Sequence, residues 1–127
     1  MKPDEFNPRL YRIVVVDDDP TEREILVELL SCPSRSVEAF ESAESALEYL
    51  QQNPVDLAFL DHVMPGMKGA ELAEQIKLLS PATRIVMCTG YLVEVGHPKV
   101  CADVERVLHK PLNLGEVLHL ADVCATS

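Results

Sequence analysis

Short apolar segments along the chain predict the strands of a single sheet. Three of them, residues 11–16, 55–60 and 84–88, are dominated by Val, Ile, Leu and other apolar residues. Continuous runs of this kind are typical of strands that are buried on both faces. Two weaker extended segments, residues 36–40 and 106–109, complete a set of five predicted strands.

Between these segments the apolar positions change to the spacing of an α-helix. Helices are predicted at about residues 20–30, 43–52, 70–79 and 113–123. Another helix is expected between Thr89 and Arg106, but Gly96-His97-Pro98 interrupts it. Alternating strands and helices predict an α/β fold, a doubly wound, five-stranded parallel sheet in a (βα)5 order with an irregular fourth helix.

The length of the chain leaves room for one domain. Its 127 residues are 47% hydrophobic, which is enough for one substantial core. We expect the domain to occupy residues 12–124, between an N-terminal arm at 1–11 and a C-terminal tail at 125–127.

The charge of the chain restricts its partners. It has 11 Lys and Arg against 21 Asp and Glu, a formal net charge of −10, which would repel nucleic acid and an anionic membrane surface. We therefore expect no direct contact with nucleic acid or membrane, whereas a bound cation or basic protein partners fit. The first 12 residues are charged and contain proline instead of the apolar core of a signal peptide, which favours a cytoplasmic location.

Four of the five predicted strands end on residues that can take part in chemistry. Asp17 and Asp18 follow the first strand, and Asp61, Thr89 and Lys110 follow three later strands. Each residue alone has an ordinary explanation as a helix cap, turn residue or surface residue. Ligands bind at the carboxyl ends of the strands in an open parallel sheet, so we expect all five side chains to converge on one site.

The expected site is rich in carboxylates. Three of them at one edge repel each other and need a cation, which Lys110 or a metal ion could supply. Oxygen ligands with open coordination positions suit Mg²⁺. A metal, a lysine and the Thr89 hydroxyl together match the needs of phosphoryl transfer. The four histidines, among them His62, fall at no metal-ligand spacing and are expected at the surface or in loops.

Four motifs resemble those of the response regulator receiver family of two-component systems. They are, in chain order, VVVDDDP at 14–20, LDHVMPGMKG at 60–69, VMCTG at 86–90 and HKP at 109–111. The resemblance extends from about Arg12 to Val123. It implies a chemotaxis-regulator-like, flavodoxin-like fold with strand order 2-1-3-4-5.

The resemblance also implies a function for the acidic residues. Asp61 would accept a phosphoryl group from a histidine kinase, a phosphotransfer protein or a small phosphodonor. Asp18, Asp61 and the backbone carbonyl of His62 would bind Mg²⁺ directly, and Asp17 would bind it directly or through water. The chain would not be a turnover enzyme, but would switch protein interactions with an unknown output partner or a fused output domain.

Other matching positions would bind the phosphoryl group itself. The Thr89 hydroxyl and the amide of Gly90 would contact its oxygens. Lys110 would pair with Asp61 before transfer and with the phosphoryl group afterwards, and a cis peptide is expected before Pro111.

Two departures from the family concern the output face. Val107 replaces the usual aromatic residue, which moves inward when the Thr shifts on phosphorylation, and Asp103-Val104 replaces the common Gly-Ala pair. The face of the fourth helix and fifth strand, where receivers often dimerise, is therefore expected to be unusual. We expect signalling through another surface or with a weaker switch; a homodimer is one possible assembly.

Two further positions are known in the family to tune the lifetime of the phosphoryl group. They are Val63, two residues after Asp61, and Tyr91, two residues after Thr89. Neither is an acid or an amide that would orient an attacking water. The sequence therefore predicts slow self-dephosphorylation.

Two alternatives remain open. Asp17, Asp19 and Thr21 form the D-x-D-x-T motif of a haloacid-dehalogenase-type phosphatase, with Asp17 as nucleophile and Asp19 as acid/base, but only Glu116 and Asp122 follow Lys110 as acidic ligands. The other alternative is a pseudo-receiver, a binding module that keeps the fold without the phosphate chemistry.

Overall fold

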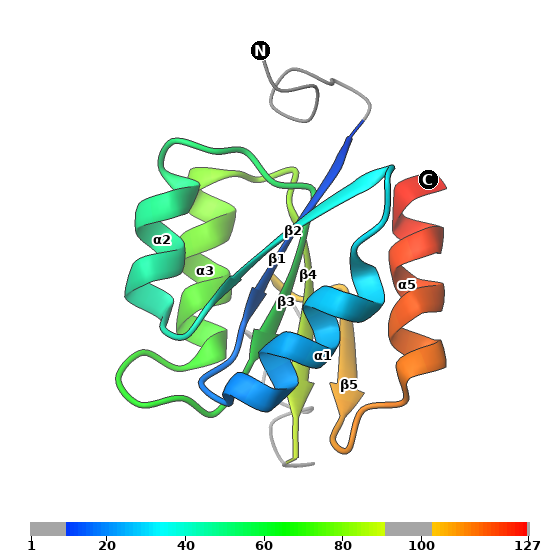
Figure 1. Ribbon diagram of the computed structural model, residues 1–127. Helices are drawn as coiled ribbons and strands as arrows, with labels where there is room; N and C mark the ends of the chain where they lie inside the picture. The colour runs from blue at the N-terminus through cyan, green and yellow to red at the C-terminus, as the bar shows by residue number, and fades with distance from the viewer. Residues whose placement is uncertain (1–9, 91–102, 127) are drawn as a thin grey trace.

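The protein has the five parallel strands that the sequence predicts. The computed structural model describes residues 10–90 and 103–126, and the strands lie in the order β2-β1-β3-β4-β5. Their bounds are β1 Tyr11–Val16, β2 Arg35–Phe40, β3 Leu57–Asp61, β4 Arg84–Thr89 and β5 Arg106–His109. Every neighbouring pair is parallel, so the carboxyl ends of the strands share the lower edge of the sheet in Figure 1.

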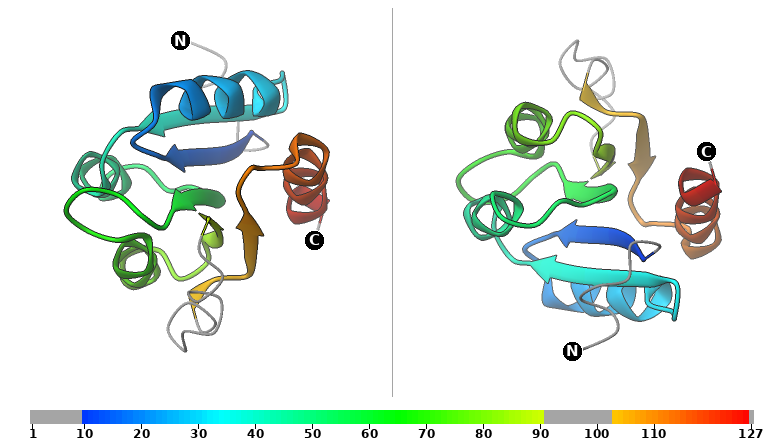
Figure 2. Two further views of the ribbon diagram at one scale, coloured as in Figure 1. Left: turned by 90° about the horizontal axis from the view of Figure 1, so that it is seen from below. Right: turned by 90° about the horizontal axis from the view of Figure 1, so that it is seen from above.

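Helices cover both faces of the sheet. They are α1 Pro20–Leu30, α2 Ala43–Leu50, α3 Gly69–Leu79 and α5 Leu114–Thr126. Helices α1 and α5 lie against one face and α2 and α3 against the other, as Figures 1 and 2 both show. This confirms the predicted doubly wound α/β fold, while the predicted irregular fourth helix, at 91–102, lies outside the described residues.

Two apolar layers fix the central strands, one on each face of the sheet. Val14 and Val16 of β1 pack in the layer under α2 and α3, whereas Ile13 and Val15 pack in the layer under α1 and α5. All four are at most 1% exposed, because successive side chains of a strand point to opposite faces. Burial of a large aliphatic side chain contributes about 1.5–3 kcal/mol, so the strands that carry the site are firmly anchored.

The start of α1 positions the residues that follow β1. The side chain of Asp19 caps the helix by accepting a hydrogen bond from the amide of Thr21 at 2.9 Å, and Pro20 occupies the first turn. Both features favour a helix start at this point. The chain therefore turns sharply after Asp17 and Asp18, whose side chains remain at the edge of the sheet.

Several predicted boundaries were wrong by a few residues. Strand β3 begins at Leu57 and not at 55, since Asp56 uses its side-chain Oδ2 to accept the amide of Arg12 at 2.8 Å. Helix α2 ends at Leu50, where the Asn53 side chain bonds a late carbonyl of the helix.

The terminal elements reach slightly beyond 12–124. Strand β1 begins at Tyr11, which pairs with Arg35 of β2. Helix α5 continues to Thr126, because the buried Cys124 still packs in the core layer under α1 and α5. Among the described residues, no helix is both long and apolar enough to cross a membrane.

Candidate functional site

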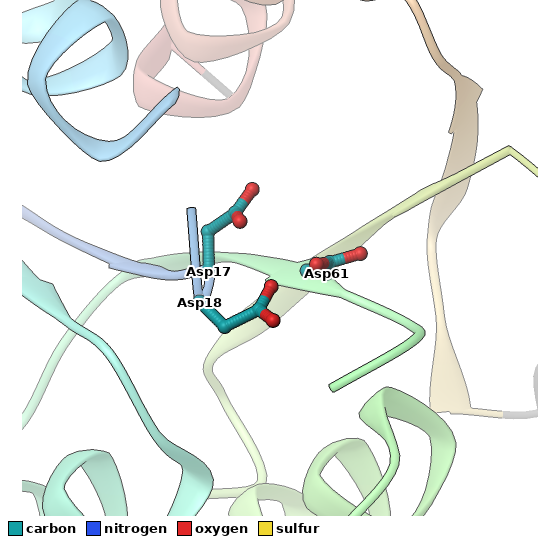
Figure 3. A group of neighbouring side chains, drawn as sticks. All are labelled: Asp17, Asp18 and Asp61. Atoms are coloured by element: carbon teal, nitrogen blue, oxygen red, sulfur yellow. The ribbon is translucent and has the colours of Figure 1, made fainter. Parts of the chain in front are cut away.

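Three carboxylates meet at the carboxyl ends of β1 and β3. Val16 and Leu60 are register partners at the end of these strands, so Asp17, Asp18 and Asp61 emerge side by side, as Figure 3 shows. One oxygen of each carboxylate lies within 4.8 Å of those of the other two. The predicted convergence of these acids is confirmed.

Two of the three carboxyl groups are buried. Asp17 is 3% exposed and Asp61 is 7% exposed, whereas Asp18 is open to solvent. Burial raises the pKa of Asp61 to about 6, and the charge of Asp17 adds to the rise, against the opposing charge of Lys110. Burial likewise raises the pKa of Asp17, against the hydrogen bond from the Asp19 amide and the charge of Lys110. A cation would therefore be attracted strongly to this site.

Lys110 brings a positive charge to the cluster, as predicted. Its Nζ lies 3.3 Å from Oδ1 of Asp61 and 3.4 Å from Oδ2 of Asp17. The shortest contact, 2.8 Å, goes to Oε2 of Glu22 on α1. Burial alone would lower the pKa of Lys110, but the hydrogen bond to Glu22 and the charges of Asp17 and Asp61 outweigh burial and raise it. The lysine therefore stays charged.

Glu22 is a residue of this site that the sequence did not reveal. Its position in the first turn of a helix is ordinary for an acid, since the helix dipole favours negative charge there. Its proximity to Lys110 depends on how α1 packs beside the end of β5. The only signal in the sequence is its place three residues after Asp19.

The ends of β4 and β5 bring Thr89 and Lys110 to the same edge. Cys88 is the register partner of Asp61, so Thr89, which is 1% exposed, follows one residue beyond. The amide of Lys110 donates to the carbonyl of Thr89 at 2.9 Å, and the peptide bond before Pro111 is cis, as expected. Gly90 is exposed, and Tyr91 lies outside the described residues.

His62 lies in the loop after Asp61, within the range of the prediction, but it is buried there. It is 3% exposed, and its amide donates to the carbonyl of Cys88 at 3.0 Å. The His62 carbonyl accepts the amide of Gly69 at 2.9 Å. This bond closes the loop onto α3. A carbonyl oxygen has two lone pairs, so its role as a metal ligand stays a prediction.

Gly69, the last residue of the motif at 60–69, is the most closely packed point of this loop. A Cβ at position 69 would lie 2.6 Å from the carbonyl oxygen of Asp61, 2.7 Å from Cα of His62 and 2.8 Å from Sδ of Met87. Only glycine allows this approach. Helix α3 thus begins directly against the backbone of the candidate phospho-acceptor.

Val63, the lifetime-tuning position within the described residues, and Val107, the departure at the output face, have different surroundings. The side chain of Val63 is 46% exposed, and its amide lies 3.4 Å from Oδ1 of Asp61. Val107, on β5, is half-buried against the core layer under α2 and α3. Neither presents a polar side chain to Asp61.

Two contacts hold Asp17 in place, one from α1 to its backbone and one from the Asp19 amide to its side chain. Nη1 of Arg23 donates to the carbonyl of Asp17 at 2.7 Å, and the amide of Asp19 donates to Oδ1 of the same residue at 2.9 Å. Together with Lys110, these donors orient the Asp17 carboxylate.

The acidic residues that the phosphatase alternative requires besides Asp17 lie outside the carboxylate cluster. The side chain of Asp19 caps α1 and is exposed. Asp122 forms an ion pair with Arg35 at 2.8 Å, and Glu116 is exposed. Within the described part of the chain, the cluster that could hold a metal comprises only Asp17, Asp18 and Asp61, so the structure does not favour this alternative.

Comparison with known proteins identifies the family. The model of the response regulator receiver domain matches residues 13–122. The chain belongs to the response regulator receiver family. A receiver protein of Brucella abortus, CpdR, is 34% identical over 111 residues, covering 87% of this chain and 92% of that protein.

Other relatives show receivers within longer proteins and the same fold. A cyclic di-GMP phosphodiesterase of Thermotoga maritima is 34% identical over 109 residues, but this receiver spans only 29% of its length. The CheY-like receiver domain of Methanospirillum hungatei superposes with a TM-score of 0.85 at 28% identity, covering 92% of this chain and 94% of that one. A receiver of a two-component system is thus established, both by sequence and by fold.

Proposed function

We propose that this receiver accepts a phosphoryl group on Asp61 in a Mg²⁺-dependent transfer, from a histidine kinase, a phosphotransfer protein or a small phosphodonor. The observation that carries the proposal is the arrangement around Asp61. Its carboxylate is buried, shares a cluster with Asp17 and Asp18, and has Lys110 at 3.3 Å. A cytoplasmic location belongs to the same proposal, as does a single domain, predicted at 12–124, whose terminal elements reach from Tyr11 to Thr126.

The donor set fits Mg²⁺. Two oxygens bound to one Mg²⁺ at about 2.1 Å lie at most about 4 Å apart, and the carboxylate oxygens of the cluster already lie within 4.8 Å of one another. Asp17, Asp18 and Asp61 would hold the ion. Once bound, Mg²⁺ would neutralise these carboxylates and attract phosphoryl oxygens.

The chain's own groups can carry out the transfer. Both contacts of the Asp61 carboxylate within the described residues go to Oδ1, so Oδ2 is the oxygen that we assign to the attack. For a phosphohistidine or phosphoramidate donor, a bond forms between this oxygen and phosphorus as the bond from phosphorus to the donor nitrogen breaks. The nitrogen takes the bonding electron pair, whose charge is balanced by a proton that the donor already carries. Lys110 and the Thr89 hydroxyl would stabilise the negative charge on the phosphoryl oxygens.

Incubation with phosphoramidate provides a direct test. With Mg²⁺ present, we expect intact-mass spectrometry to show the addition of one phosphoryl group, and EDTA in excess should prevent it. A protein that takes up no phosphoryl group and binds neither Mg²⁺ nor beryllofluoride would be a pseudo-receiver instead.

The phosphoryl group should be long-lived. The apolar side chain of Val63 is exposed beside Asp61 and cannot orient a water molecule for attack. The donor is first removed by buffer exchange, with Mg²⁺ kept in excess. We then expect the intact-mass signal of the phosphorylated protein to decay over minutes or longer. Loss of the group within seconds would contradict this role of Val63.

The output would be a change in protein interactions and not catalytic turnover. In this chain β5 carries Val107 where the family usually has an aromatic residue, so we propose that the signal leaves through a surface other than the usual one or with a weaker conformational switch. A phosphorylated structure in which the face beside β5 rearranges in the usual way would contradict this. The proposed receiver of this signal is an output partner protein or a fused output domain.

A further inference from the structure

Lys110 is shared between the phosphorylation site and a carboxylate outside it. Its Nζ lies 2.8 Å from Oε2 of Glu22, but 3.3 and 3.4 Å from Asp61 and Asp17. Glu22 does not belong to the cluster that could hold a metal. The best-formed ion pair of this lysine therefore points away from the candidate acceptor, toward α1.

Both partners of this ion pair are held in place by the fold. Glu22 lies in the first turn of α1, whose start is fixed by the Asp19 cap and Pro20. The backbone of Lys110 is tied to β4 through the Thr89 carbonyl at 2.9 Å. The side chains are 27% and 23% exposed, so this contact is shielded from solvent more than a surface ion pair and is screened less by salt.

The charges around Lys110 make its partners compete. One ammonium group serves the carboxylates of Asp17, Asp61 and Glu22. Phosphorylation of Asp61 would replace one carboxylate with a group of greater negative charge, whose oxygens need Lys110. Glu22 then opposes capture of the phosphoryl group in two ways, because it holds the lysine and adds a negative charge nearby.

We propose that Glu22 is a positioning residue that restrains Lys110, so that phosphorylation requires the lysine to exchange Glu22 for the phosphoryl oxygens. The inference deepens the proposed function and rests on it. Removal of the Glu22 charge should release Lys110 toward Asp61 and Asp17. This has opposite consequences for two ligands: a phosphoryl analogue should bind more tightly, whereas Mg²⁺ alone should bind more weakly because the lysine competes with it.

The first measurement is the affinity for beryllofluoride at saturating Mg²⁺, by isothermal titration calorimetry. We expect Glu22→Gln to bind it about fivefold to tenfold more tightly than the native protein. The matched control is Glu24→Gln, which removes the same charge from an exposed position of the same helix and should stay within about twofold of native. Unchanged or weaker binding in Glu22→Gln overturns the proposal.

The second measurement is the Mg²⁺ affinity without any phosphoryl analogue. We expect Glu22→Gln to weaken Mg²⁺ binding several-fold, with Glu24→Gln again close to native. This measurement does not depend on phosphorylation. The proposed function fails if the native protein takes up neither beryllofluoride nor a phosphoryl group. The restraint on Lys110 is overturned separately, if Glu22→Gln leaves the Mg²⁺ affinity unchanged.

A conservative variant separates position from charge. Glu22→Asp keeps the negative charge but shortens the side chain, which draws the carboxylate back from Lys110. It should shift both affinities in the same directions as Glu22→Gln, to a smaller extent. Native affinities in a folded Glu22→Asp together with shifted ones in Glu22→Gln would mean that charge alone acts, and would overturn the positioning role. If Glu22→Gln does not fold, Glu22→Asp decides alone: affinities shifted in the expected directions support the restraint, and native affinities overturn it.

Discussion

Replacement of Gly69 by alanine is expected to destabilise the protein by about 3 kcal/mol, at the upper end of the usual cost of overpacking a well-packed site. The new Cβ would lie 2.6 Å from the carbonyl oxygen of Asp61 and 2.7 Å from Cα of His62. Both are backbone atoms at the end of a buried strand, which cannot move aside as a flexible side chain could. The alternative is a displaced start of α3, which would break the bond from the Gly69 amide to His62.

Urea unfolding at pH 7 measures this effect. Gly90→Ala is the matched control, because a Cβ at position 90 meets no atom of the described residues within 4 Å, and its stability should stay within about 0.5 kcal/mol of native. The variants differ only in where one methyl group is added. Equal unfolding midpoints for the two variants would show that the loop after Asp61 is not packed as tightly as described.

Replacement of Asp61 by asparagine is expected to stabilise the metal-free protein at pH 7 by about 1–3 kcal/mol. Burial raises the pKa of Asp61 to about 6 from the ordinary value of 3.8. Between these values the folded state binds more protons than the unfolded state, so stability falls as pH rises through this window and stays low above it. Asparagine removes that cost, and Lys110 keeps Glu22 and Asp17 as partners.

The difference in stability between Asp61→Asn and the native protein should depend on pH. Below about pH 4, where Asp61 is protonated in both states, native protein and Asp61→Asn should unfold at similar urea concentrations. Above pH 6 the variant should be the more stable, unless Mg²⁺ is added, which should stabilise the native protein more than the variant. As a control, Glu24→Gln should track the native protein at every pH. Lower stability of Asp61→Asn at pH 7 without metal would contradict the buried charge described here.

The sequence predicted the acidic edge of the site because the relevant signals are local. An apolar run that ends on a polar residue is visible at Val16-Asp17 and Leu60-Asp61, and a parallel sheet brings all such ends together. Thr89 and Lys110 followed from the same signal, because each comes directly after a predicted strand. Asp61 could thus be placed near Lys110 without any coordinates.

Other features depend on packing and could not be predicted. Glu22 meets Lys110 only because α1 and the end of β5 lie close together, although 88 residues separate the two in the chain. The burial of His62 follows from the path of the loop after β3, and a polar residue in a Pro- and Gly-containing segment looks like a surface residue. The role of Gly69 likewise depends on the distance between α3 and β3.

Identification of the phosphorylated residue tests the central claim most directly. The protein would be phosphorylated with phosphoramidate and Mg²⁺, reduced with borohydride, which converts an aspartyl phosphate to homoserine, and mapped by peptide mass spectrometry. We expect homoserine at position 61 of the native protein and none in Asp61→Asn or when Mg²⁺ is removed. Homoserine at position 17 or 18 would contradict the assignment of Asp61, and at position 17 it would favour the phosphatase alternative.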